Sequence, residues 1–219
     1  MTYSPTPDVI DRLAGIQPGD ALDAIRAHRP QARLHAQQSY IALFEPTAPA
    51  PGEPTQFSLA QRFAVAVFVA GLHGEADLVD FYAQGLSRQA GAQSLRDVVA
   101  AEAVEAAVRG PYGRFPAGPL SAEDLPGPRH AVSQGHRAVL GDRLSAALVH
   151  AHLLVLHPRD AEASHLQALL DAGWSTTDIV TLSQLVAFLS FQIRVVAGLQ
   201  ALAAASAPST LVAADTAVA

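Results

Sequence analysis

Residues 140–203 constrain the fold of this chain more than any other stretch, because they read as three consecutive helices with a breaker at each junction. Apolar residues recur with a helical period over 143–156, and Pro158 follows where it would end a helix. A second helix is expected over 160–172, before a glycine. The third, over 175–203, begins with polar capping residues and is apolar nearly all round. We therefore expect an all-α fold with this last helix at its centre or at a subunit contact.

The rest of the chain also favours helices over strands. Half of its residues are hydrophobic, only 16% are charged, and alanine is abundant. Apolar runs between proline, glycine and capping residues predict six further helices, over 8–16, 20–28, 30–44, 59–72, 75–86 and 94–108.

Two helix pairs have similar sequences around their breakers. Leu72-His73-Gly74 follows one capped apolar helix, and Leu156-His157-Pro158 follows another. We interpret this as a degenerate internal repeat. Proline and glycine over 110–130 exclude regular structure there, and a loop of this length is usually functional or interfacial. The predicted organisation is N-terminal helices and a Pro-rich linker (1–56), a first helical repeat (57–110), a Pro/Gly-rich loop (111–139), a second helical repeat (140–205) and a disordered tail (206–219).

Residues 157–199, HPRDAEASHLQALLDAGWSTTDIVTLSQLVAFLSFQIRVVAGL, resemble the core repeat of the alkylhydroperoxidase D-like and carboxymuconolactone decarboxylase family. The peroxidase branch of that family has Cys-x-x-Cys-x-x-x-His at the start of the second helix. Here the same frame reads Pro158, Ala161 and His165, followed by an Ala-Gly helix end. The decarboxylase branch lacks the cysteines and keeps the histidine, so this chain matches it better. The resemblance implies an AhpD-like helical fold of two degenerate repeats.

The resemblance also indicates site residues. It makes His165 the candidate proton carrier, since a neutral imidazole can move a proton near pH 7. His157 and Arg159 flank the place of the missing cysteines, which makes His157 a second catalytic candidate and Arg159 a substrate-binding one. For His152 we prefer a structural role as a buried, hydrogen-bonded imidazole.

Three more residues are candidates for substrate binding. Arg143 or Arg194 could hold an acid substrate through a bidentate contact. The alternative for each arginine is a surface charge or an ion pair. Tyr82 stands in the first repeat roughly where His165 stands in the second.

Two classes of function fit these features. The first is an enzyme of the family, for which a peroxidase or peroxiredoxin activity would be the general expectation. Peroxide reduction requires a thiolate, however, and the chain has no cysteine. Acid/base chemistry on a small carboxylate or lactone, with His165 carrying the proton, is therefore the more consistent prediction. The second class is a non-catalytic ligand-binding or oligomeric assembly protein that kept the fold.

Composition limits the partners. The net charge of −6 gives no general attraction to nucleic acid. Polar residues interrupt the longest apolar window, 179–202, and the N-terminus does not resemble a signal peptide, so we expect no membrane partner and a cytoplasmic location.

No cofactor is expected. No metal is expected either. His150 and His152 face different sides of a helix, and His150 and His157 share a face but lie too far apart along the axis for one ion. The chain also has no cysteine and no paired carboxylate at the right spacing. The apolar last helix predicts a homodimer or higher oligomer.

Overall fold

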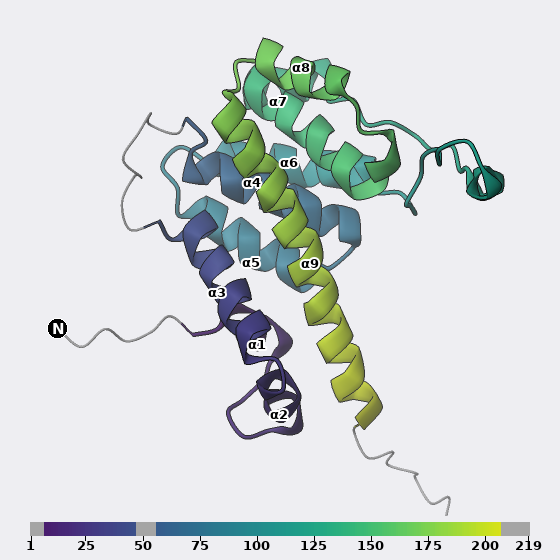
Figure 1. The fold of residues 1–219 in the computed structure, drawn as a ribbon. Helices are drawn as coiled ribbons and strands as arrows, with labels where there is room; N and C mark the ends of the chain where they lie inside the picture. Colours follow the sequence, from purple (N-terminus) through teal and green to yellow (C-terminus); the bar gives the residue numbers. More distant parts are fainter. Residues whose placement is uncertain (1–6, 47–55, 207–219) are drawn as a thin grey trace, which may run out of the picture.

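The computed structural model describes residues 7–46 and 56–206. Within these ranges the chain is all-α, as predicted, with nine α-helices, two short 3-10 helices and no strand (Figure 1). In chain order the elements are α1 (Val9–Ala14), α2 (Ala21–Ala27), α3 (Pro30–Phe44), α4 (Leu59–His73), α5 (Ala76–Ser87), α6 (Gln93–Ala106), η1 (Pro119–Glu123), α7 (Gln134–Leu156), η2 (Pro158–Asp160), α8 (Ala163–Asp171) and α9 (Thr176–Ser206).

Local capping explains where the helices begin and end. At the start of α4, the Ser58 hydroxyl accepts a hydrogen bond from the backbone N–H of Gln61, and the Gln61 side chain accepts one from the Ser58 N–H. Gly74 ends this helix in the left-handed conformation, with φ at 74°. Pro30 is the first residue of α3. The predicted starts at Leu59 and Pro30 are confirmed.

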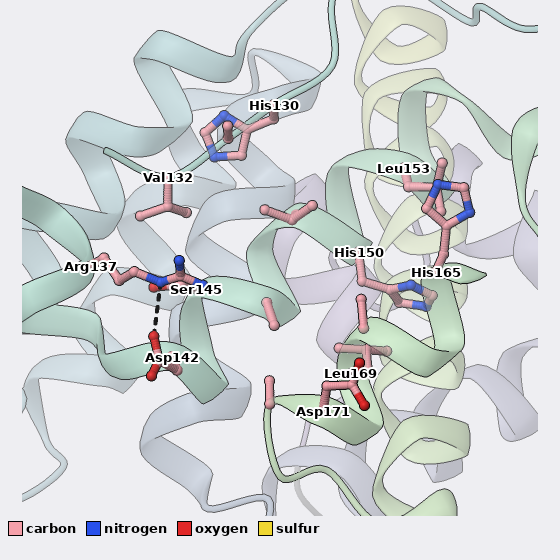
Figure 2. Close-up of a pocket in the computed structure, with 15 residues that line it drawn as sticks. His130, Val132, Arg137, Asp142, Ser145, His150, Leu153, His165, Leu169 and Asp171 are labelled. Atoms are coloured by element: carbon pink, nitrogen blue, oxygen red, sulfur yellow. Dashed lines mark ion pairs between the residues drawn. The ribbon is translucent and has the colours of Figure 1, made fainter. Parts of the chain in front are cut away.

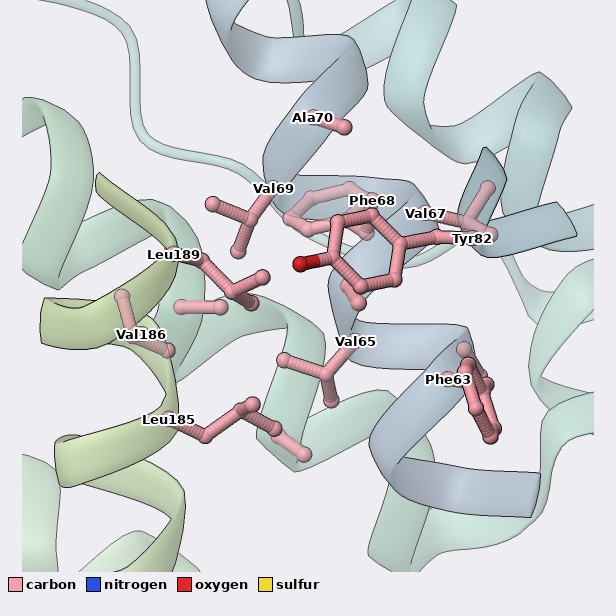
Figure 3. Packing of buried hydrophobic residues seen from close by; sticks show 14 of the residues in the cluster. Phe63, Val65, Val67, Phe68, Val69, Ala70, Tyr82, Leu185, Val186 and Leu189 are labelled. Carbon is pink, nitrogen blue, oxygen red and sulfur yellow. The ribbon is translucent and has the colours of Figure 1, made fainter. Parts of the chain in front are cut away.

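The centre of the fold is α4. It packs against α5, α6, α7 and α9 (Figures 1 and 3), and every residue from Phe63 to Ala70 is buried. Small residues let its neighbours approach closely, since a Cβ added at Gly71 would lie only 2.6 Å from the Ala103 Cβ. Of the two positions expected for the helix over 175–203, the centre of the fold is therefore taken by α4 instead.

The long helix α9 runs along the outside of this arrangement (Figure 1). One face is buried against α4 and α7, and the other exposes large apolar side chains, including Val180, Phe191 and Leu202. Apolar residues all round α9 thus do not place it at the centre, because α4 already occupies that position.

The segment between α6 and α8 differs from the prediction in two places. The Ser133 hydroxyl accepts a hydrogen bond from the His136 N–H and starts α7 at Gln134, so 134–139 is helical and the loop does not extend to 139. Gly141 kinks α7 with φ at 74°. Within the predicted irregular stretch, η1 and an isolated antiparallel bridge between Gly113 and Leu125 form.

The two predicted units each contain three helices, α4–α6 and α7–α9, and both contribute to one continuous hydrophobic core. Their relationship as internal repeats stays a prediction. The linker predicted over 45–56 lies largely outside the described residues. So does the tail predicted over 206–219, apart from Ser206, which ends α9.

Two helices, α7 and α9, are long and apolar enough to cross a membrane, judged by length and composition alone. In this fold, 61% of the most apolar stretch of α7 and 50% of that of α9 are buried inside the protein. Helices of a hydrophobic core have the same properties, so these two are weak evidence for a membrane span.

Candidate functional site

A cavity of about 620 Å³ opens between α7 and α8 (Figure 2). Its walls are largely aliphatic side chains, and its polar groups come from both helices and from the segment that precedes α7. Figure 2 shows His150 and His165 on one side of the cavity and the ion pair of Arg137 and Asp142, 2.9 Å apart, on the other. The cavity therefore brings the predicted proton carrier, His165, together with a second histidine.

His150 presents an unused lone pair. Its ring is 5% exposed, and its Nε2 lies 3.4 Å from the hydroxyl oxygen of Ser183 on α9. That hydroxyl donates its own hydrogen to the Ile179 carbonyl, so it can only accept from Nε2–H. The Nδ1 atom is then the acceptor, and among the described residues it is buried without a hydrogen-bond partner.

Burial also determines the charge of His150. Loss of solvation, with a smaller contribution from nearby His165, lowers the pKa of His150 to about 4. The imidazole is therefore neutral at pH 7, and its free Nδ1 can accept a proton or a hydrogen bond.

His165 lies in the first turn of α8, and the nitrogen that it pairs within the protein is Nδ1 instead of Nε2. Its Nδ1 accepts a hydrogen bond from the backbone N–H of Glu162 at 3.2 Å, so in the neutral ring Nε2 carries the hydrogen. This Nε2 lies 3.5 Å from Nη1 of Arg129, which is also a donor. Two donors that face each other suit an anionic oxygen. Arg129 also pairs with Asp160 at 3.8 Å and borders the neighbouring cavity of His157, so it reaches His165 from that side.

His157, the other predicted catalytic residue, lies elsewhere. It is 2% exposed and faces a separate polar cavity of about 650 Å³. Its Nδ1 lies 3.1 Å from an Asp160 carboxylate oxygen, and its Nε2 lies 2.9 Å from the Pro128 carbonyl oxygen. Its ring stacks between those of Tyr112 and His152, with centroid distances of 5.2 and 5.8 Å. Both nitrogens face protein acceptors, which fits a role in holding the loop.

His152 continues this stack towards the core. It is buried, and its ring lies 5.5 Å from that of His130, which in turn stacks on Phe68. Burial, followed by the charges of His130 and His157, lowers the pKa of His152 to about 4. The prediction that His152 is a buried imidazole is confirmed.

The four predicted substrate-binding residues are not brought to the cavity. The Arg143 guanidinium pairs with Asp178 at 3.1 Å, donates to the Gly173 carbonyl at 2.6 Å and stacks 4.4 Å from the Trp174 ring, so it joins α7 to the start of α9. Arg159 lies over the Phe115 ring at 4.2 Å in the cavity of His157.

Arg194 and Tyr82 lie further away. Arg194 is exposed and borders an apolar groove of about 880 Å³ along α9. Tyr82 is fully buried in the core (Figure 3), where its hydroxyl donates a hydrogen bond to the side-chain oxygen of Gln192. A substrate cannot reach this tyrosine in the structure.

Sequence reasoning missed the free Nδ1 of His150 and the position of Arg129. The state of His150 depends on Ser183, which is 33 residues later, and no local pattern links the two residues. Arg129 lies in a Pro/Gly-rich segment whose path is not readable from periodicity.

Comparison with protein-family models, with curated proteins and with solved structures finds no match for this chain. The resemblance of residues 157–199 to the alkylhydroperoxidase D-like and carboxymuconolactone decarboxylase family therefore stays a prediction.

Proposed function

We propose that this protein is an enzyme that moves a proton on a small carboxylic acid or lactone bound in the cavity between α7 and α8. The observation that carries the proposal is the histidine pair of this cavity. His150 offers a buried, free acceptor nitrogen, and His165 offers a donor nitrogen. A base and a donor on residues that line one cavity are the minimum that general acid/base catalysis needs.

Each group has a distinct role in this proposal. The His150 Nδ1 removes a proton from the carbon next to the substrate carbonyl, and the pair of His165 Nε2–H and Arg129 holds the substrate oxygen on which charge develops. The same proton, or one from solvent, returns to the substrate from His150. The aliphatic walls take the hydrocarbon part of the ligand and exclude water.

Substrate charge would also tune the base. A base with a pKa of about 4 is weak at pH 7. A bound carboxylate places a negative charge beside the ring, which favours imidazolium and raises this pKa towards neutrality. An acidic substrate thus improves His150 as a base, whereas a neutral one leaves it weak.

The family resemblance adds two expectations to this proposal. Pro158 and Ala161 stand in the frame of the peroxidase cysteines, so thiol-dependent peroxidase activity is not part of the proposed function. The apolar face of α9, with Phe191 47% exposed, favours a homo-oligomer, and we expect the protein in the cytoplasm. Light scattering after gel filtration tests the oligomer, and a mass near 22.9 kDa at micromolar concentration would contradict it.

Hydrogen exchange in D₂O tests the proposed activity. A panel of small lactones and keto acids is incubated with the protein, and loss of the proton next to the carbonyl is followed by NMR. We expect exchange that falls about 100-fold or more in His150→Gln and His165→Gln. The exposed His35, which is hydrogen-bonded to Gln38, provides the control variant His35→Gln, which should exchange normally.

The same experiment separates the alternative function. Ligands that bind, as shown by chemical-shift changes, but exchange no faster than in buffer would identify a non-catalytic ligand-binding protein. Exchange that is unchanged in both cavity variants would refute the assignment of the site.

A further inference from the structure

Glu102 on α6 is a carboxylate in an apolar environment. It is 0% exposed, and the residues around it on the inner face of α6, such as Val99, Ala103 and Ala106, are apolar. A buried carboxylate is costly unless a cation neutralises it. Among the described residues no arginine lies within ion-pair distance of Glu102, and the chain has no lysine.

The groups that do surround Glu102 are imidazoles. His136 Nδ1 lies 2.5 Å from one carboxylate oxygen, and His130 Nε2 lies 2.9 Å from the other. The second contact is not aligned as a hydrogen bond, so Glu102 Oε2 and His130 Nε2 are buried polar atoms without a hydrogen-bond partner among the described residues.

A second carboxylate completes the arrangement. Glu105 follows Glu102 by three residues on α6, a spacing that puts both side chains on one face of the helix. One ligand atom each from Glu102, Glu105 and His136 lie within 4.8 Å of one another. Ligand atoms bound to one ion at about 2.1 Å lie at most about 4.2 Å apart, so a small side-chain adjustment brings this set to bonding distance.

We propose that Glu102, Glu105 and His136, joined by His130, bind one divalent transition-metal ion. Two carboxylates with imidazole nitrogens are the donor set of zinc, manganese and iron sites. The ion would supply the positive charge that the buried carboxylate lacks. It would also tie α6 to the segment before α7 and to the first turn of α7, and so hold His130 in the wall of the cavity.

This site differs from the sequence expectation that no metal binds. That expectation rested on histidines two or seven residues apart, whereas the carboxylates lie more than 30 residues before His136. The Glu-x-x-Glu spacing on a helix rich in alanine and valine is the signal that would have revealed them. The proposal does not depend on the activity assigned to His150 and His165.

Isothermal titration of the tag-free full chain, first stripped with EDTA, tests the site with Zn²⁺ as the probe. We expect one equivalent to bind and to raise the Tm. Co²⁺ should bind at the same site and give the visible absorption of cobalt with nitrogen and oxygen ligands. Manganese serves as a second probe, since tighter binding of Mn²⁺ than of Zn²⁺ would still support the site.

Variants of the two less buried ligands, Glu105 and His136, test which residues bind the ion. Glu105→Gln and His136→Gln remove groups that are exposed or half-buried, so both variants should fold, and each should weaken Zn²⁺ binding at least tenfold. Glu123→Gln, at an exposed glutamate of η1, and His35→Gln are the matched controls and should bind like the wild type. Absence of binding at 100 times the protein concentration, or binding that is unchanged in both ligand variants, would overturn the proposal.

Discussion

His150 and His157 are both almost completely buried, and both belong to the same stretch of α7 and its end, but their ring nitrogens differ. Both nitrogens of His157 face oxygen acceptors of the protein, and its ring lies in a stack. His150, which lines a cavity, has one nitrogen beside Ser183 and one that is buried without a hydrogen-bond partner among the described residues. Burial alone therefore does not separate a structural from a chemically available histidine. The two kinds of histidine are distinguished by whether a ring nitrogen has a lone pair without a hydrogen-bond donor.

Other pairs in the molecule show the same contrast. The Arg143 guanidinium is half-buried and held by Asp178, Gly173 and Trp174, whereas Arg129 is largely exposed and has one distant ion pair, with Asp160 at 3.8 Å, beside the His165 ring. Groups with several protein partners fix the positions of helices, and groups with fewer partners remain available to a ligand.

The largest expected effect is the pH dependence of stability that His150 causes. Its pKa is about 4 in the folded protein and about 6.5 when unfolded, so between these values the unfolded state binds more protons. Stability is therefore full above pH 6.5 and is lost as the pH falls to 4, by about 3 kcal/mol at 1.36 kcal/mol per pKa unit. Urea denaturation across this range should show a smaller loss in His150→Gln than in wild type. Parallel curves for the two proteins would contradict the neutral, buried state of His150.

Next in size is the difference in stability between two truncations. His157→Ala should lower the free energy of unfolding by about 2 kcal/mol more than His150→Ala, because it leaves the Pro128 carbonyl without its partner and removes one of the contacts of Asp160. His150 makes only one hydrogen bond, at 3.4 Å, and already borders open space. Urea midpoints at pH 7.5 measure both changes. Equal losses would mean that the two histidines are equally structural.

A smaller effect concerns Arg129. Arg129→Gln should weaken binding of a small carboxylate to the cavity by about 1 kcal/mol, or about fivefold, since the arginine is largely exposed and its ion pairs are screened. Titration calorimetry with the best ligand of the panel measures this change. Arg114→Gln provides the control, because both arginines border the cavity of His157 but only Arg129 lies beside the His165 ring, at 3.5 Å. An equal loss in both variants would show only a general effect of net charge.

No effect at all is expected with organic hydroperoxides. A dithiol reductant with cumene hydroperoxide should be consumed no faster than in buffer, because the chain has no thiol to form the intermediate. Turnover above this background that disappears in His165→Ala would require a different mechanism.

The sequence predicted local features better than tertiary ones. Ser58, Gly74 and Gly173 act within a few residues of their helices, so the helix limits were readable. Both α4 and α9 are strongly apolar, and only packing decides that α4 takes the centre. The helix predicted from residue 143 begins earlier, at Gln134, and continues through Gly141 as a kink.

The site was predictable only in part. The resemblance identified His165, which does line a cavity. Tyr82 and Arg143 instead contact other side chains of the protein: Tyr82 donates a hydrogen bond to Gln192, and Arg143 forms an ion pair with Asp178. These partners lie 110 and 35 residues away, beyond any helical period. A contact of that range is visible only once the chain is folded.

The protonation of the His150 ring is the central claim, and nitrogen NMR of the imidazoles tests it directly. At pH 7, His150 should show an unprotonated Nδ1 and a protonated Nε2, and it should titrate near pH 4. A bound carboxylate should move the Nδ1 signal and raise this pKa. A His150 ring that carries its hydrogen on Nδ1, or that titrates near pH 6.5 and ignores every ligand of the panel, would contradict the account.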